Sequence, residues 1–258
     1  MTLRCCAVLS ALAGGRILGA RHGAPPARVV ALHGWRRSHA DFDAILAGLD
    51  AVAPDLPGFG ASAPPPSAWG SAEYAEAVRP LCEEGGPVVL VGHSFGGRVA
   101  VMLAAAHPEV VKGLVLTGTP LWRPAGSAPP RAPIGYRVAR RLNRIGIISD
   151  RAMEARRRQS GSEDYKAATG VMREVLVKVI GETNDGTYRQ ALSQVRCPIE
   201  LTWGALDTAA PVAVAEEAAR SITGAALTVL PGVGHLTPTD APAAIRDAID
   251  RLASGSEA

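Results

Sequence analysis

Short apolar runs alternate with helix-length segments along most of this chain, and no other feature restricts the fold as much. Such runs are typical of strands buried on both faces, and the helix-length segments between them supply the crossovers that parallel strands need. We therefore predict an α/β fold with a mostly parallel sheet and helices on both faces. The predicted strands are 28–32, 51–53, 88–91, 114–117, 199–203 and 227–230, and the predicted helices are 41–49, 72–84, 96–106, 212–222 and 243–252.

The alternation stops between about residues 121 and 189, where a proline-rich stretch leads into helical patterns only. One apolar stripe there consists of Ile134, Val138, Leu142 and Ile145, and another of Val171, Val175 and Val179. No strand fits this segment, so we predict a helical insertion at 121–189 in a single core formed by 1–120 and 190–258. A chain of 258 residues is long enough to bury such a core without disulfides or metal.

The insertion carries most of the positive charge of the chain. It holds 14 basic and 7 acidic residues, whereas the remainder holds 13 basic and 17 acidic ones. Arg137, Arg141 and Arg144 have the spacing of one helix face, and Arg156 to Arg158 follow in the next segment. These charges predict attraction of an anionic or carrier-bound substrate, and a merely solvated arginine-rich surface is the alternative, since 24 of the 27 basic residues are arginine.

Composition excludes several other classes of protein. The 11 aromatic residues do not interleave with basic ones, so the pattern argues against nucleic-acid binding. Cys5, Cys6, Cys82 and Cys197 have no zinc-ligand spacing and indicate no disulfide framework, so we expect neither a metal nor an organic cofactor. No apolar run approaches the length of a membrane span. Nothing in the sequence predicts the oligomeric state.

The first twenty residues have two interpretations. Arg4, the apolar stretch 5–12 and the small residues near it resemble a signal peptide. A β-hairpin formed by 7–12 and 17–20 around Gly14-Gly15 is the interpretation we favour, because a Gly-Gly turn accepts positive φ angles. A hairpin in place of a signal peptide predicts a cytoplasmic protein.

The motif that carries chemistry is Gly92-His93-Ser94-Phe95-Gly96. It follows the predicted strand 88–91 directly and precedes a helical run, which is the context of a nucleophile at a strained strand-to-helix turn. Small residues at 92, 96 and 97 allow a sharp bend there. The alternative is an ordinary glycine-rich turn with an idle serine.

Together with this motif, several others make the sequence resemble the α/β-hydrolase family over nearly the whole chain. They are His33-Gly34 after strand 28–32, Asp55-Leu56-Pro57-Gly58-Phe59-Gly60 after strand 51–53, and a late Asp and a late Gly-His. The resemblance implies an α/β-hydrolase fold, and it makes the helical insertion the cap of that family.

A serine nucleophile needs a base and a group that orients the base. Of six histidines, His235 after the last strand fits the base. The others fit less well: His22 and His39 lie in polar sequence, His107 precedes a proline, His33 belongs to the loop motif and His93 should point away from Ser94. The family places its acid after the sixth or the seventh strand. The sixth is followed by no acid, so Asp207 after 199–203 is the candidate, with capping of the next helix as the alternative role.

An oxyanion hole requires two backbone N–H groups. The N–H of Phe95, directly after the nucleophile, is one candidate, and the resemblance assigns the other to Trp35. We expect both residues also to contact the substrate, although Trp35 as plain packing is the alternative.

Serine at the elbow implies an acyl-enzyme, unlike the aspartate of related dehalogenases and epoxide hydrolases. We therefore predict a serine hydrolase of a small carboxylic ester or thioester, with Ser94, Asp207 and His235 as triad. Three alternatives remain: a cofactor-free haloperoxidase or perhydrolase, a carbon–carbon bond hydrolase, and a ligand-binding protein on this fold that does not catalyse.

Overall fold

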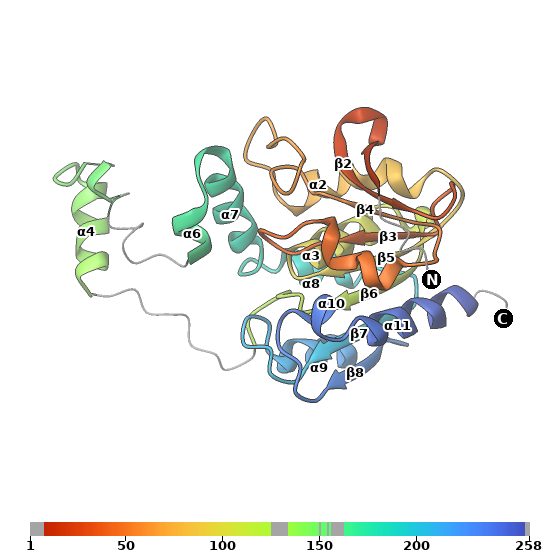
Figure 1. Cartoon of the computed structure of the whole chain (residues 1–258). Helices are drawn as coiled ribbons and strands as arrows, with labels where there is room; N and C mark the ends of the chain where they lie inside the picture. Colours follow the sequence, from red (N-terminus) through yellow and green to blue (C-terminus); the bar gives the residue numbers. More distant parts are fainter. Residues whose placement is uncertain (1–7, 125–133, 150, 154, 156–162, 256–258) are drawn as a thin grey trace.

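The computed structural model describes residues 8–124, 134–149, 151–153, 155 and 163–255. Its centre is an eight-stranded sheet in the order β1-β2-β4-β3-β5-β6-β7-β8 (Figure 1). The strands are β1 (Val8–Leu12), β2 (Ile17–His22), β3 (Val29–Leu32), β4 (Ala51–Pro54), β5 (Val88–His93), β6 (Val111–Thr117), β7 (Ile199–Gly204) and β8 (Ala226–Leu230). From β4 to β8 across the sheet all neighbours are parallel, as predicted.

The first two strands form the predicted hairpin. β1 and β2 pair antiparallel through a short turn in which Gly14 and Gly15 have φ angles of 68° and 85°. β2 then pairs antiparallel with β4 and so joins the hairpin to the parallel part of the sheet. Residues 1–7, where the signal-like pattern begins, lie outside the described residues.

Helices cover both faces of the sheet because its central strands are apolar on both faces. In β5, Val88 and Leu90 pack in one core cluster, whereas Val89 and Val91 pack in the other. The first cluster lies under α2 (Ser71–Val78), α3 (Phe95–Ala106), α8 (Thr187–Leu192) and α9 (Val212–Ser221), and the second under α1 (Asp43–Leu46) and α11 (Pro242–Ser254). Short helices η1 (Ala13–Gly15), η4 (Pro108–Val110) and α10 (Thr237–Asp240) complete the connections.

Two predicted helices are shorter than the sequence pattern indicated. The stretch 41–49 divides into η2 (His39–Phe42) and α1, which ends just before Gly48 with its φ of 77°. The stretch 72–84 is α-helical only to Val78 and continues as η3 (Arg79–Cys82). Pro80 has no N–H to donate to the preceding turn, which explains the change.

The segment between β6 and β7 contains α4 (Ile134–Arg144), α6 (Glu163–Ala167), α7 (Gly170–Glu182) and α8, and no strand among its described residues. The stripe on α7 is buried at Val175 and Val179, which are at most 1% exposed, and partly buried at Val171. The stripe on α4 is not: Val138 and Ile145 are 52% and 64% exposed, and α4 lies apart from the sheet (Figure 1). Arg156 to Arg158 lie outside the described residues.

A buried arginine joins the core to this helical segment. Arg98 of α3 donates from Nε to the Pro120 carbonyl at 3.0 Å and from Nη1 to the Val179 carbonyl of α7 at 3.3 Å. Its guanidinium also lies 5.4 Å from the centre of the Tyr188 ring in α8. The helix that begins at the elbow is therefore held directly against α7 and α8.

Candidate active site

Ser94 lies at a sharp turn between β5 and α3. Its φ and ψ angles are 52° and −112°, a conformation that a residue with a side chain rarely adopts. The Ser94 N–H donates to the Thr117 carbonyl at 3.0 Å, which fixes the turn to the end of β6. The strained turn presents the serine side chain at the carboxyl ends of the central strands.

Close packing around the turn explains its glycines. A Cβ atom on Gly96 would collide with the Leu32 carbonyl of β3, and one on Gly97 would collide with the Thr119 side chain. A Cβ on Gly92 would meet the Gly97 backbone, 2.8 Å from the Gly97 nitrogen. The beginning of α3 thus sits against β3 and the end of β6 at distances that only glycine permits.

His235 and Asp207 meet Ser94 from two loops far along the chain. His235 Nε2 is 3.0 Å from Ser94 Oγ, and His235 Nδ1 is 2.8 Å from Asp207 Oδ2. Because the carboxylate can only accept, Nδ1 carries the proton and the lone pair of Nε2 faces the serine hydroxyl. The structure therefore brings all three predicted residues together in one hydrogen-bonded chain.

Asp207 is buried, with 4% of its surface exposed, and uses both carboxylate oxygens. While Oδ2 faces His235, Oδ1 accepts from the N–H groups of Ala209 and Ala210 at 2.9 and 2.8 Å. It does not cap the next helix, because α9 begins after Pro211 without a side-chain cap. The carboxylate instead holds the 207–210 turn and the imidazole at the same time.

The loop after β3 lies against the nucleophile. A Cβ on Gly34 would be only 3.3 Å from the Ser94 Cβ. The Gly34 carbonyl accepts from His33 Nδ1 at 2.8 Å, while His33 Nε2 accepts from the Leu56 N–H at 2.9 Å. Burial lowers the pKa of His33, which keeps the imidazole neutral as this pattern requires. The Gly34 carbonyl and the Trp35 N–H belong to the same peptide group, and in a trans peptide they point in opposite directions. Because the carbonyl faces His33 Nδ1, the Trp35 N–H points away from His33.

Aromatic side chains form one wall beside this loop. The Trp35 ring packs edge-on against Phe59 at 4.8 Å and against Phe95 at 5.5 Å between ring centres. A cavity of about 200 Å³ opens next to them, and its lining comes from the loop after β3, the loop after β4 and the α6–α7 region. Its residues are Trp35, Arg36, Gly58, Phe59, Ala167, Ala168, Thr169 and Met172.

Of the histidines set aside in favour of His235, one lies in surroundings less polar than expected. The His22 side chain is only 7% exposed, because it belongs to β2 inside the sheet. His39 is 2.9 Å from Asp55, a buried carboxylate that also accepts from the N–H groups of His39 and Ala61. His107 pairs with Glu76 on the surface. None of the three contacts the serine.

Sequence reasoning missed two residues that contact His235. His93 Nε2 does not pair with Ser94 but donates to the His235 carbonyl at 2.9 Å. Burial lowers the pKa of His93 to about 4, so the ring is neutral at ordinary pH. Gly118, with a φ of 52°, leaves room for the pair, since a Cβ there would lie 3.1 Å from Asp207 Oδ2 and His235 Nδ1. Only their positions, at the end of β5 and directly after β6, could have drawn attention to them.

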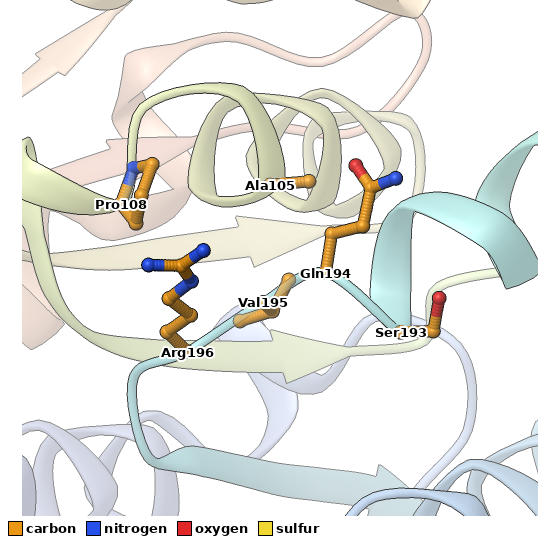
Figure 2. A pocket seen from close by; sticks show the side chains of 6 residues that line it. All are labelled: Ala105, Pro108, Ser193, Gln194, Val195 and Arg196. Carbon is orange, nitrogen blue, oxygen red and sulfur yellow. The ribbon is translucent and has the colours of Figure 1, made fainter.

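A second hollow, of about 470 Å³, lies at the far end of α3 (Figure 2). Ala105 and Pro108 line one side, and the connection 193–196 between α8 and β7 lines the other. Ala105 is ten residues along α3 from Phe95, or roughly 15 Å at 1.5 Å per residue. This hollow is therefore separate from the serine site. Among the described residues no three His, Cys, Asp or Glu side chains group as metal ligands would.

Comparison with known proteins agrees with this fold. The family model described as "Alpha/beta hydrolase family" matches residues 29–248, and the chain belongs to that family. A pimeloyl-[acyl-carrier protein] methyl ester esterase of Aromatoleum aromaticum is 31% identical over 254 residues, covering 86% of this chain and 97% of that protein. A thermophilic esterase of Thermogutta terrifontis superposes with a TM-score of 0.63 at 26% identity, covering 96% of this chain and 97% of that one. These relatives agree with the predicted class, a carboxylic ester hydrolase.

Not every relative has a name that states ester hydrolysis. The magnesium-chelatase 30 kDa subunit of Rhodobacter capsulatus is 29% identical over 231 residues, covering 80% of this chain and 79% of that protein. Within the part of the chain that the structure describes, no helix is both long and apolar enough to cross a membrane.

Proposed function

We propose that this protein is a serine hydrolase that cleaves carboxylic esters or thioesters through an acyl-enzyme. The observation that carries the proposal is the chain from Ser94 Oγ to His235 Nε2 at 3.0 Å and from His235 Nδ1 to Asp207 Oδ2 at 2.8 Å. The base lies within hydrogen-bond distance of both the nucleophile and the orienting acid, and His235 is in the tautomer that a general base requires.

The reaction follows from this arrangement. Ser94 Oγ attacks the carbonyl carbon while His235 Nε2 takes its proton, and the same nitrogen then gives the proton to the leaving alkoxide or thiolate. Water, deprotonated by His235, releases the acid from Ser94 in the second half. Asp207 holds the imidazole and stabilises its positive charge. The N–H groups of Phe95 and Trp35 are our candidates for stabilising the oxyanion.

The charge of one segment and the name of one relative support a substrate with an anionic or carrier-bound part. The segment 121–189 has 14 basic and 7 acidic residues, and Arg137, Arg140, Arg141 and Arg144 of α4 are exposed. The relative from Aromatoleum aromaticum is named for an ester held on an acyl carrier protein. We propose that 121–189 acts as a cap over the core formed by 1–120 and 190–258, and that the cap attracts such substrates.

The test compares the wild type with Ser94→Ala on a panel of methyl, 4-nitrophenyl and thiol esters of varied acyl length. We expect Ser94→Ala to lower kcat by about 10³-fold or more, without loss of stability, because the hydroxyl supports no core packing. Ser193→Ala, at an exposed position in the second hollow, is the matched control and should keep full activity.

The same panel separates the alternatives. Hydrogen peroxide as acceptor reports perhydrolysis, and a vinylogous 1,5-diketone reports carbon–carbon bond cleavage. If no ester is cleaved but an ester binds, the protein is a ligand-binding member of the family and the proposed function is wrong.

A further inference from the structure

The cavity beside Trp35 has an apolar body and one charged side chain. Its lining consists of aromatic, alanine and methionine side chains together with Gly58, Thr169 and Arg36. At about 200 Å³ it is smaller than the roughly 300 to 1,000 Å³ of sites for drug-sized ligands, so it suits a short chain. Trp35 links the cavity to the reaction, because the backbone beside it lies against Ser94.

Arg36 is held in a conformation that favours glycine. Its φ is 57°, and it occupies the third position of a turn closed by the Arg37 N–H and the Gly34 carbonyl at 3.2 Å. That turn position commonly carries glycine where φ is positive. Arg36 is a long charged residue in a strained position, two residues after the glycine that lies against Ser94, and stability does not explain this.

The pairing of Arg36 is loose enough to exchange. Its Nη1 is 3.5 Å from Asp164 Oδ1 of α6, and the two side chains are 55% and 50% exposed. Arg37, the next residue, differs: it makes two hydrogen bonds to Asp41, at 2.7 and 2.5 Å. A long, half-exposed ion pair contributes little and is screened by salt, so a better anion can displace Asp164. Glu163 beside it is already paired with Lys166 at 2.8 Å.

We propose that Arg36 determines specificity by binding an anionic group of the substrate, a carboxylate separated from the reacting ester by a short apolar chain. The apolar chain lies along the wall of Trp35 and Phe59, and the carboxylate replaces Asp164 on the guanidinium. Planar, bidentate pairing with a carboxylate is the interaction that arginine makes best. This inference rests on the proposed hydrolysis at Ser94 and names its substrate class, half-esters of short dicarboxylic acids.

The experiment compares monomethyl glutarate with dimethyl glutarate, which differ in one charge at nearly equal length. For Arg36→Gln and Arg36→Gly we expect kcat/KM for the monoester to fall about fivefold through KM, with the diester unchanged. Arg36→Gly also removes the backbone strain, so it should fold at least as well as the wild type. Asp164→Asn should raise kcat/KM for the monoester alone, and Arg37→Gln is the matched control without effect on the ratio.

Binding provides a readout independent of turnover. Calorimetry with Ser94→Ala protein should detect monomethyl glutarate, and adding Arg36→Gln should weaken its binding about fivefold. Equal affinities with and without Arg36, or an unchanged ratio of the two esters in the Arg36 variants, would overturn this inference while leaving ester hydrolysis intact. If the wild type cleaves other esters but neither glutarate ester, this inference is wrong and ester hydrolysis stands. If it cleaves no ester at all, the proposed hydrolysis is wrong, and the binding measurement still decides the role of Arg36.

Discussion

Asp207 combines two tasks in one side chain. Its Oδ1 holds the 207–210 turn through two backbone N–H groups, and its Oδ2 orients His235. Sequence reasoning weighed the second task against capping of the next helix, and it did not predict the first. The structure shows that they depend on separate oxygens, so substitutions can separate them.

Asp207→Asn keeps an oxygen for the turn but places an amide N–H against His235, which favours the wrong tautomer. We expect kcat to fall about 10³- to 10⁴-fold with KM nearly unchanged, as expected for a residue that orients the base. Asp207→Ala should show the same loss of activity and also lose about 1 to 3 kcal/mol of stability, since two buried N–H groups lose their acceptor. Urea unfolding with ester kinetics checks both. A nearly silent Asp207→Asn would mean that another acid orients His235.

His93 makes stability depend on pH. Burial lowers its pKa from 6.5 to about 4, so between these values the unfolded chain binds a proton that the folded chain does not. Stability therefore falls as the pH decreases through this window. We expect the wild type to lose about 2 to 3 kcal/mol more than His93→Gln between pH 7.5 and 4.5, measured by urea unfolding. Parallel pH profiles for the two proteins would contradict the buried, neutral His93.

At the scale of elements, α3 connects the elbow with the helical segment. Arg98 caps two carbonyls, one after β6 and one on α7, and is itself buried. Nearby, Tyr188 of α8 donates to Glu182 of α7 at 2.6 Å, and its hydroxyl lies 2.7 Å from Ser71 Oγ of α2. These buried polar contacts add to the apolar packing that attaches α7 and α8 to the core.

Arg98→Met should preserve the apolar stem while leaving the Pro120 carbonyl without its donor and the Val179 carbonyl with only the Thr183 hydroxyl. We expect a loss of about 2 to 4 kcal/mol of stability, together with faster proteolysis within 121–189. Arg140→Met, at an exposed position on α4, is the control and should change stability by less than about 0.5 kcal/mol. If Arg98→Met unfolds at the wild-type urea concentration, the segment is held by apolar packing alone.

The elements that sequence patterns predicted well are those whose burial is periodic. The apolar runs of β5 and β6 and the small residues of the elbow point to one structure only, because each position is constrained by packing on both sides. The same reasoning failed for α4, where the stripe with Val138 and Ile145 is apolar but remains exposed. Contacts such as His93 to the His235 carbonyl join residues 142 apart, and no local pattern encodes them.

The whole molecule has an uneven distribution of charge. Segment 121–189 has an excess of basic residues on an otherwise acidic chain. Such a field raises the association rate of an anionic substrate more than its affinity, and salt weakens it. Long-range attraction by this segment is distinct from the contact proposed for Arg36, because it needs no particular geometry.

The salt dependence of kcat/KM therefore distinguishes long-range attraction by segment 121–189 from direct contact with Arg36. We expect kcat/KM for a carboxylated ester to fall between low salt and 0.15 M, where charges beyond about 8 Å are screened, and that for a neutral ester of equal length to stay constant. Replacing Arg137, Arg141 and Arg144 together by glutamine should remove most of the difference. Equal salt responses for the two esters would show that these arginines form only a solvated surface.

Labelling with a fluorophosphonate shows directly whether His235 activates Ser94. Peptide mapping by mass spectrometry should find the label on Ser94 alone in the wild type. His235→Ala should slow labelling about 10³-fold or more, because the serine loses its base. A label on another residue would mean that Ser94 is not the activated nucleophile, and labelling of Ser94 at the wild-type rate in His235→Ala would mean that His235 is not its base.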